Sequence, residues 1–266
     1  MNNIYRIRRI LLIAVVVSLF SFILISNAQA GKIILANDEW TLSNTGFNAS
    51  NDAAIFASNI ASWFNGGSSG SFLVYSTYFG RTQSSLATTM TSSGNSWSVS
   101  MAITFDLPTL LTYDAIFLAG NAANNDVLID YVNAGGNVYL AGGTGAGGAV
   151  NEAAQWNTFL NTFGLGFGSP YNGVSGNMPI NSLHPIFAGV DYLYESNGSD
   201  TLDIDSSDPR SAVVVSSNGH GLYAVYDSGP DPDPAAVPEP STFLLLGAGL
   251  VGVGLIVGIS RRKLRA

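Results

Sequence analysis

The sequence of 266 residues contains no cysteine. Disulfide bonds, thiolate metal sites and thiol nucleophiles are therefore excluded, because each of them requires that side chain. A folded domain in this chain must be held together by packing and hydrogen bonds alone. Its hydrophobic content of 47% suffices for a buried core, although two strongly apolar ends contribute to that figure.

Basic residues are nearly absent from the middle of the chain. Between Gly31 and Val237, three basic residues (Lys32, Arg81 and Arg210) stand against seventeen acidic ones, which gives a formal charge of −14. Nucleic acids are bound through clusters of lysine and arginine, so this composition excludes nucleic acid as a partner. It is typical of a soluble surface outside the cell, or of one that gathers cations.

The other basic residues flank apolar segments at the two ends of the chain. Near the N-terminus, three arginines within residues 6–9 precede an apolar run at residues 10–25, and the sequence Ala-Gln-Ala at residues 28–30 follows. This order predicts a signal peptide that the Sec machinery exports and that is cleaved before Gly31. An uncleaved membrane anchor is the alternative, because the apolar run is somewhat long for a signal peptide.

The last part of the chain contains three consecutive signals. Pro238, Glu239 and Pro240 form a stiff, extended element, since proline fixes φ and disfavours a helical conformation in the residue before it. Residues 242–259 are uncharged and mostly apolar, a length that crosses a hydrocarbon core of about 30 Å as a helix. A cationic stop that stays on the cytoplasmic side of a membrane follows, formed by Arg261, Arg262, Lys263 and Arg265.

This order of motif, apolar segment and basic tail resembles the PEP-CTERM sorting signal of Gram-negative bacteria. The resemblance implies an exported protein whose precursor is anchored in the inner membrane by a C-terminal transmembrane helix. It also implies an exosortase as the partner that processes the tail, and a final location at the cell surface or outside the cell. Such systems are associated with bacteria that produce exopolysaccharide.

The two ends of the chain together define its expected organisation. The sequence predicts a signal peptide at residues 1–30, an exported domain at 31–227, a linker rich in Pro and Asp at 228–240, a transmembrane helix at 241–260 and a basic cytoplasmic tail at 261–266.

Apolar segments of strand length alternate with segments of helical pattern through most of the exported domain. This alternation indicates an α/β fold with a mostly parallel sheet and helices on both faces, joined by right-handed crossovers. We expect strands at Lys32–Ala36, Ser71–Ser76, residues 97–103, Asp114–Ala119 and Asn137–Ala141, and helices at residues 52–64, near Leu86, at 124–134 and at 150–163. Beyond Gly164 the sequence predicts short strands at residues 192–195, 201–205, 212–216 and 222–226, as an antiparallel extension of one edge.

The segments YDAIFLAG at residues 113–120, GGNVYLAGGTG at 135–145 and HPIFAGV at 184–190 resemble the class I glutamine-amidotransferase-like domain, a doubly wound, flavodoxin-like α/β fold. In catalytic members, the strand that matches NVYLAG leads to a cysteine two residues before a glycine, and this position falls on Gly143. The His-x-Glu pair of those members is also missing, since neither histidine of the chain has a Glu two residues later. The resemblance therefore implies the scaffold without cysteine-dependent amide transfer.

Polar residues follow the carboxyl ends of several predicted strands, where open α/β sheets bind their ligands. The glycine-rich turn at residues 142–148 leads from a strand into a helix, so its backbone N–H groups can cradle an anion. A tight turn that needs small residues is the alternative. The turn lacks the Lys and Ser/Thr of a P-loop and the acidic partner of a dinucleotide site, so no cofactor is expected. The expected ligand pocket comprises Asn37, Asp38, Asn121, Gly143, Thr144 and Glu152.

Asp203 and Asp205 lie in an acid-rich segment, at the spacing of residues that share one face of a strand. Their carboxylates can offer oxygen ligands to calcium, although the segment is not an EF-hand loop. The alternative is a solvated acidic edge that discourages aggregation between strands.

Two functions are compatible with these features. The first is a non-catalytic binding or structural role of the exported domain at the cell surface or in an exopolysaccharide matrix, with polysaccharide as the partner. The second is a hydrolase or sugar-processing enzyme that uses Asp38, Glu39 or Glu152 with a bound metal in a pocket at the strand ends. In the enzyme these three side chains must converge in one concave pocket, whereas in the binding protein they are scattered and solvated.

Overall fold

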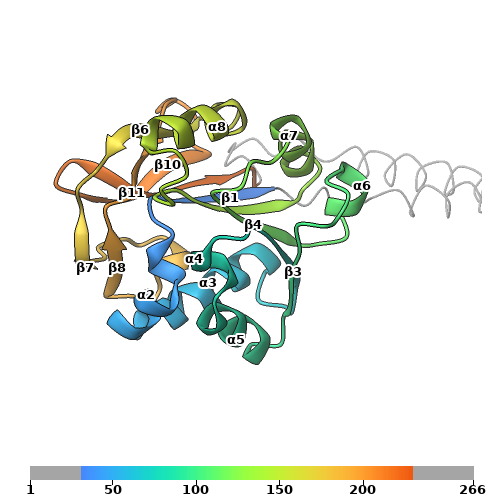
Figure 1. Ribbon diagram of the computed structural model, residues 1–266, viewed down its shortest axis with the longest axis horizontal. Helices are drawn as coiled ribbons and strands as arrows, with labels where there is room; N and C mark the ends of the chain where they lie inside the picture. The colour runs from blue at the N-terminus through green and yellow to red at the C-terminus, as the bar shows by residue number, and fades with distance from the viewer. Residues whose placement is uncertain (1–30, 230–266) are drawn as a thin grey trace, which may run out of the picture. The chain divides into compact units, whose positions relative to one another are not determined.

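The computed structural model describes residues 31–229 (Figure 1). The predicted signal peptide, PEP motif, transmembrane helix and basic tail lie outside the described residues. Within residues 31–229, no helix is both long and apolar enough to cross a membrane. The strands are β1 (Lys32–Ala36), β2 (Ser71–Tyr75), β3 (Ser96–Val99), β4 (Ala115–Ala119), β5 (Asn137–Ala141), β6 (Leu165–Tyr171), β7 (Ser175–Pro179), β8 (Tyr192–Ser196), β9 (Ser199–Asp203), β10 (Ser211–Ser217) and β11 (His220–Asp227). The helices are α2 (Asn44–Ala49), α3 (Asp52–Asn65), α4 (Phe79–Thr82), α5 (Ser84–Ser92), α6 (Leu107–Leu110), α7 (Asn125–Asn133) and α8 (Ala149–Asn161), with 3-10 turns η1 (Trp40–Leu42) and η2 (Pro185–Phe187).

Seven strands form one sheet in the order β10-β11-β1-β5-β4-β2-β3. The strands from β1 to β3 in this order run parallel to one another, which confirms the predicted mostly parallel sheet. β1 and β5 have the predicted bounds, because each is a short, almost wholly buried apolar run closed by polar residues or glycine.

Successive residues of the parallel strands pack into two cores on opposite faces of the sheet. Ile34 of β1 belongs to the core that α3 and α5 cover, whereas its neighbour Ile33 belongs to the core that α7 and α8 cover. Figure 1 shows α3 and α5 on one side of the sheet and α7 and α8 on the other. Burial on both faces explains why these strands read as continuous apolar runs rather than as alternating ones.

The order of the parallel strands differs from that of flavodoxin, in which the first strand lies between the second and the third. In this protein β1 lies beyond β5, next to β11. The connection from β1 to β2 contains η1, α2 and α3, and it crosses β5 and β4. The α/β architecture with a mostly parallel sheet is therefore present, but in a different strand order from the expected one.

The antiparallel extension consists of two strands rather than four. β10 and β11 form a hairpin that adds to β1, and its turn residues Asn218 and Gly219 have φ angles of 53° and 84°, as a type I′ turn requires. The other two predicted strands form separate ladders, in which β8 pairs with β7 and β9 pairs with β6. Neither β6 nor β7 was expected, since the sequences LGFGSPY and SGNMP contain glycine and proline, which disfavour strands.

The two ends of the described domain lie side by side. The backbone N–H and the hydroxyl group of Ser228 both donate to the carbonyl oxygen of Gly31, at 3.1 and 2.8 Å. In the antiparallel ladder of these two strands, Lys32 at the start of β1 lies opposite Asp227 at the end of β11. The chain therefore enters and leaves this domain at the amino ends of the parallel strands, opposite the edge of the predicted ligand pocket.

Candidate functional site

The polar residues that follow β1 are buried inside the protein. Asn37, Asp38 and Glu39 are each at most 1% exposed. Arg81 of α4 and Glu195 of β8, which interact with them, have no exposed surface. We term these five residues the strand-end cluster. Ionised side chains are costly to bury unless they are paired or hydrogen-bonded, so each carboxyl group of the cluster needs a partner or a proton.

Asp38 joins two segments of the chain through backbone hydrogen bonds. Its Oδ1 accepts from the N–H of Trp40 at 2.9 Å, and its Oδ2 accepts from the N–H of Ser196. Burial raises the pKa of Asp38 to about 6, although these two hydrogen bonds and the charge of Arg81 oppose the rise. The aspartate thereby ties the loop after β1 to the end of β8.

Glu39 and Arg81 hold α4 against the same loop. The Oε2 atom of Glu39 accepts from the N–H of Gly80 at 3.1 Å, and the carbonyl oxygen of Glu39 accepts from Nη2 of Arg81 at 3.2 Å. Burial raises the pKa of Glu39 to about 7, against the opposing effects of the Gly80 hydrogen bond and the Arg81 charge. The guanidinium carbon of Arg81 also lies 4.9 Å from the ring centre of Tyr139. Arg81 is therefore an internal countercharge for this cluster of acids.

Glu195 forms a triangle of hydrogen bonds with two hydroxyl groups. Its Oε1 accepts from the hydroxyl of Tyr223 at 2.6 Å, its Oε2 lies 3.2 Å from Oγ1 of Thr41, and the two hydroxyls are 3.1 Å apart. Burial, followed by the nearby charge of Asp38, raises the pKa of Glu195 well above its usual range. A protonated carboxyl group satisfies this triangle, because it can donate from one oxygen and accept at the other.

Glu152 of α8 fills the anion cradle of the glycine-rich turn. Its Oε2 accepts from the N–H of Gly143 at 2.9 Å and from the hydroxyl of Ser199 at 2.8 Å. Its Oε1 accepts from the N–H and the hydroxyl of Thr144, at 2.7 and 2.6 Å, and from the hydroxyl of Tyr171 at 3.3 Å. The side chain is 2% exposed. The backbone N–H groups expected to bind an external anion are thus bonded to a carboxylate of the chain itself.

The position matched to the amidotransferase cysteine has no room for a side chain. Gly143 has a φ of 65°, and a Cβ atom on it would lie 2.9 Å from the Cα of Gly198 and 3.0 Å from the carbonyl oxygen of Asn37. A Cβ on Gly198 would lie only 2.2 Å from that same oxygen. The turn between β8 and β9 therefore closes the place that a nucleophile would occupy.

Among the six residues of the predicted pocket, Asn121 is set apart. It follows β4, its Oδ1 accepts from the N–H of Thr77 at 2.7 Å, and β5 separates β4 from β1. The other five lie together at the ends of β1 and β5, where they contact one another: Asn37, Asp38, Gly143, Thr144 and Glu152. The three candidate catalytic carboxylates thus converge, yet none is more than 2% exposed.

The acid-rich segment forms turns. β9 ends at Asp203, so Asp205 lies beyond the strand and does not share a strand face with it. Oδ1 of Asp203 accepts from the N–H of Asp205 at 3.1 Å, and Oδ1 of Asp205 accepts from the hydroxyl of Ser207 at 2.6 Å. In the part of the chain that the structure describes, no group of three or more His, Asp and Glu side chains is placed to hold a metal ion.

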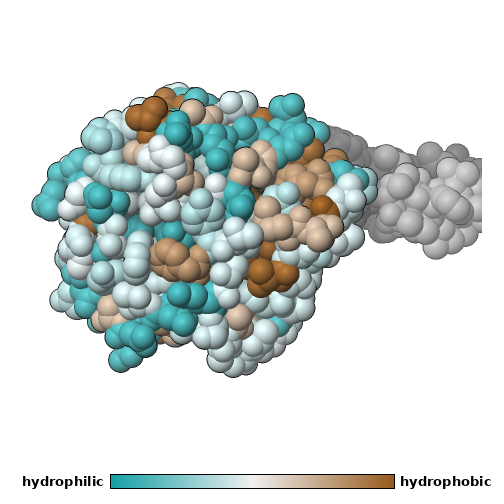
Figure 2. Space-filling view, in the orientation of Figure 1, coloured by the Kyte–Doolittle hydropathy of each residue, from teal (hydrophilic) through white to brown (hydrophobic). Residues whose placement is uncertain are grey.

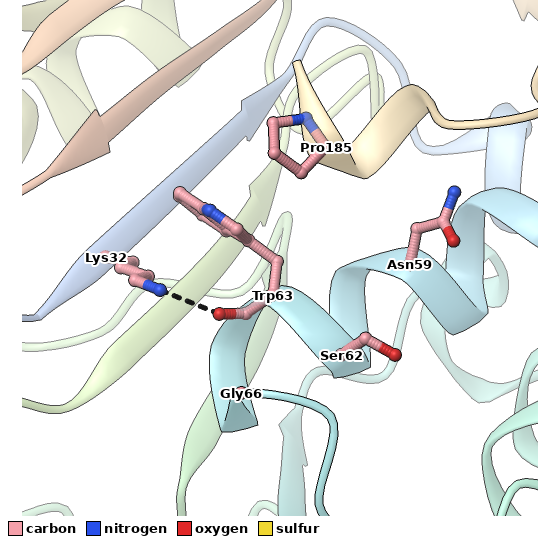
Figure 3. Close-up of a pocket in the computed structure, with 6 residues that line it drawn as sticks. All are labelled: Lys32, Asn59, Ser62, Trp63, Gly66 and Pro185. Atoms are coloured by element: carbon pink, nitrogen blue, oxygen red, sulfur yellow. Dashed lines mark hydrogen bonds between the residues drawn. The ribbon is translucent and has the colours of Figure 1, made fainter.

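A surface cleft of about 320 Å³ lies near the amino end of β1, opposite the carboxyl ends of the parallel strands (Figure 3). The sequence does not reveal it, because its residues come from three separate segments and Trp63 lies inside the predicted helix at residues 52–64. The start of β1, the end of α3 and η2 together supply the residues that line it: Lys32, Asn59, Ser62, Trp63, Gly66 and Pro185.

Contacts among these residues fix the shape of the cleft. Nζ of Lys32 donates to the carbonyl oxygen of Trp63 at 2.8 Å and lies 4.8 Å from the centre of the indole ring. The ring of His184 packs edge-on with the indole at 5.1 Å between ring centres. Nδ2 of Asn59 donates to the carbonyl oxygen of Ala188 at 2.8 Å, which attaches the segment after η2 to α3.

Comparison with known proteins identifies the C-terminal signal. The family model of the PEP-CTERM protein-sorting motif matches residues 236–263. The match confirms the predicted sorting signal and indicates an exported protein that an exosortase processes. No curated protein and no solved structure matches the chain. The resemblance of the middle region to glutamine amidotransferases therefore stays a prediction.

Proposed function

We propose that the exported domain is a non-catalytic module that binds polysaccharide at the cell surface or in an exopolysaccharide matrix. The hydrogen bonding of Glu152 is the observation that carries this proposal. Its carboxylate takes the N–H groups at the end of β5, on the edge where open α/β sheets usually place a ligand. With this edge filled by the protein's own side chains, binding is left to other surfaces.

A hydrolase is the second candidate. Its reacting carboxyl groups must lie beside a space that admits the substrate, whereas Asp38, Glu39 and Glu152 are buried and hydrogen-bonded within the domain. One property favours this candidate: the pKa of Glu39 is raised by burial to about 7, where a general acid works best near neutral pH.

Activity assays separate the two candidates. We expect the purified protein to release no ammonia from glutamine and no nitrophenol from p-nitrophenyl glycosides above a blank without protein, because no substrate reaches the buried carboxylates. Turnover that Glu39→Gln lowers at least tenfold, while Asp130→Asn on the exposed side of α7 leaves it unchanged, would establish the hydrolase instead.

A neutral polysaccharide suits the charge of the domain better than an anion. The formal charge of −14 between residues 31 and 237 repels anionic ligands, most strongly at low salt. A helix N-terminus attracts an anion by only about 0.3–1 kcal/mol, and in this protein Glu152 already uses the N–H groups of Gly143 and Thr144 in the turn that precedes α8. We therefore place a neutral polysaccharide above phosphate or nucleotide ligands.

For the C-terminal segment we propose the arrangement that the sorting signal implies. In this proposal the linker at residues 228–240 presents the PEP motif to the exosortase, the predicted helix at 241–260 holds the precursor in the inner membrane, and the tail at 261–266 stays in the cytoplasm. Sec export of residues 31–227 precedes this step. The mature protein then reaches the cell surface or the medium.

Replacing Glu239 by alanine is expected to leave uncleaved protein in the inner membrane, since the acidic residue between the two prolines is part of the recognised motif. Immunoblotting of cell fractions, with mass spectrometry of the C-terminus, measures the outcome. Asp233→Ala, which removes an acidic residue of the same linker outside the motif, serves as the control. Normal processing of the Glu239→Ala protein would show that the motif is read in another way.

A further inference from the structure

We infer that the cleft between β1, α3 and η2 is the polysaccharide site, and that it binds one neutral hexose unit of the polymer. The inference rests on the proposed polysaccharide-binding function and assigns it to a surface. This surface lies at the amino-terminal edge of the sheet, away from the strand-end cluster.

The walls of the cleft match the two kinds of surface that a sugar presents. A hexose has apolar C–H groups on the faces of its ring and hydroxyl groups around its rim. The indole of Trp63 and the ring of Pro185 supply apolar contact, and Figure 3 shows these two rings next to each other. Asn59 and Ser62 of α3 also line the cleft, and they supply an amide and a hydroxyl group for the sugar hydroxyls.

The polar groups of the cleft keep hydrogen-bonding capacity for a ligand. The ammonium group of Lys32 has three N–H donors, of which the hydrogen bond to the Trp63 carbonyl uses one. Nδ2 of Asn59 donates to the carbonyl oxygens of Ile186 and Ala188, which fixes the amide group and leaves its Oδ1 as an acceptor. Donors and an acceptor are therefore held in position before the ligand arrives, which reduces the entropy lost on binding.

The size of the cleft suits a single sugar unit of a longer chain. Its volume of about 320 Å³ lies at the lower end of the range of about 300–1,000 Å³ for ligand pockets. Ser62 and Gly66 are exposed, so the polymer can continue past the cleft into solvent. In this site Lys32 donates an N–H to a hydroxyl oxygen of the sugar, and its ammonium charge already lies against the Trp63 carbonyl and ring.

Affinity electrophoresis tests the assignment. The protein purified from the cell envelope in detergent is run through native gels that contain dextran, mannan or galactan as neutral probes, or alginate as an anionic one. Ser62→Tyr places a bulky ring in the cleft without removing a packed side chain, and Trp63→Ala removes the aromatic wall. Thr88→Tyr, at an exposed position within α5, adds the same ring elsewhere and is the matched control.

We expect at least one neutral polysaccharide to retard the wild type, with affinity at least tenfold lower for Ser62→Tyr and Trp63→Ala and unchanged for Thr88→Tyr. The melting temperature of each variant shows whether it is folded, and Ser62→Tyr decides the matter if Trp63→Ala is not. Equal retardation of Ser62→Tyr and wild type would overturn the cleft as the site and leave the proposed function intact. Stronger retardation by alginate would overturn the neutral ligand. If none of the polysaccharides retards the wild type, both the inference and the proposed function fail.

Discussion

Replacing Glu152 by glutamine is expected to lower the melting temperature of the protein by about 6–12 °C, at about 2–4 °C per kcal/mol for a domain of this size. The carboxylate accepts hydrogen bonds from five donors, and a glutamine side chain has one acceptor oxygen, with its NH₂ group turned towards other donors. A hydrogen bond to a charged group contributes about 1.5–3 kcal/mol, so the loss of two costs at least about 3 kcal/mol.

Thermal unfolding followed by circular dichroism measures this effect. Asp130→Asn is the control, because it makes the same change from acid to amide at an exposed position of α7. Its melting temperature should stay within about 1 °C of the wild type, as is usual for a surface substitution. A Glu152→Gln protein as stable as this control would show that the carboxylate does not hold the glycine-rich turn.

A vacant cradle can also be refilled from solution. Glu152→Ala removes the carboxylate but leaves the N–H groups of Gly143 and Thr144, together with the hydroxyl of Ser199. A small carboxylate such as acetate fits this donor set, and a ligand that binds only the folded state stabilises it. Acetate should therefore raise the melting temperature of Glu152→Ala and leave that of the wild type unchanged, with chloride at equal ionic strength as the reference.

The parallel strands could be predicted from the sequence, because a strand that is buried on both faces appears as a continuous apolar run. The apolar runs of β1 and β5 are bounded by polar residues or glycine, and their observed bounds are those predicted. The strands β6 and β7 carry no such signal, since they contain glycine, proline and polar residues and pair outside the main sheet. Their partners, β9 and β8, were thus assigned to the wrong sheet, because pairing over long sequence distances depends on contacts that local patterns do not encode.

The sequence likewise predicted some features of the strand-end site and not others. Parallel strands bring their carboxyl ends to one edge, so the proximity of Asp38 to Gly143 follows from the strand pattern, whereas the position of Asn121 depends on the strand order. The inward turn of Glu152 depends on the side-chain geometry at the start of α8. No local pattern indicated that Arg81 is buried, because the other two basic residues of the acidic domain, Lys32 and Arg210, are not.

Acidification from pH 8 to pH 5 is expected to stabilise the protein, by about 2–4 kcal/mol from Asp38 and Glu39 at about 1.4 kcal/mol per pKa unit. Burial raises the pKa of Asp38 from 3.8 to about 6 and that of Glu39 from 4.5 to about 7. For each residue, the folded state binds more protons than the unfolded state at pH values between the ordinary pKa and the raised one. The free energy of unfolding therefore falls as the pH rises through the raised pKa of the folded state. The raised pKa of Glu195 acts in the same direction, and the lowered pKa of His184 opposes it weakly.

Glu39→Gln isolates one contribution to this pH dependence. Glutamine can still accept the hydrogen bond from the N–H of Gly80 but does not ionise, so the variant avoids the cost of a buried charge at high pH. We expect it to be more stable than the wild type at pH 8, by about 1–3 kcal/mol, and to lose less stability between pH 5 and pH 8. Urea denaturation at a series of pH values, with Asp130→Asn as the control, gives both quantities. A pH dependence in Glu39→Gln equal to that of the wild type would mean that Glu39 stays ionised inside the folded protein, with Arg81 as its counterion.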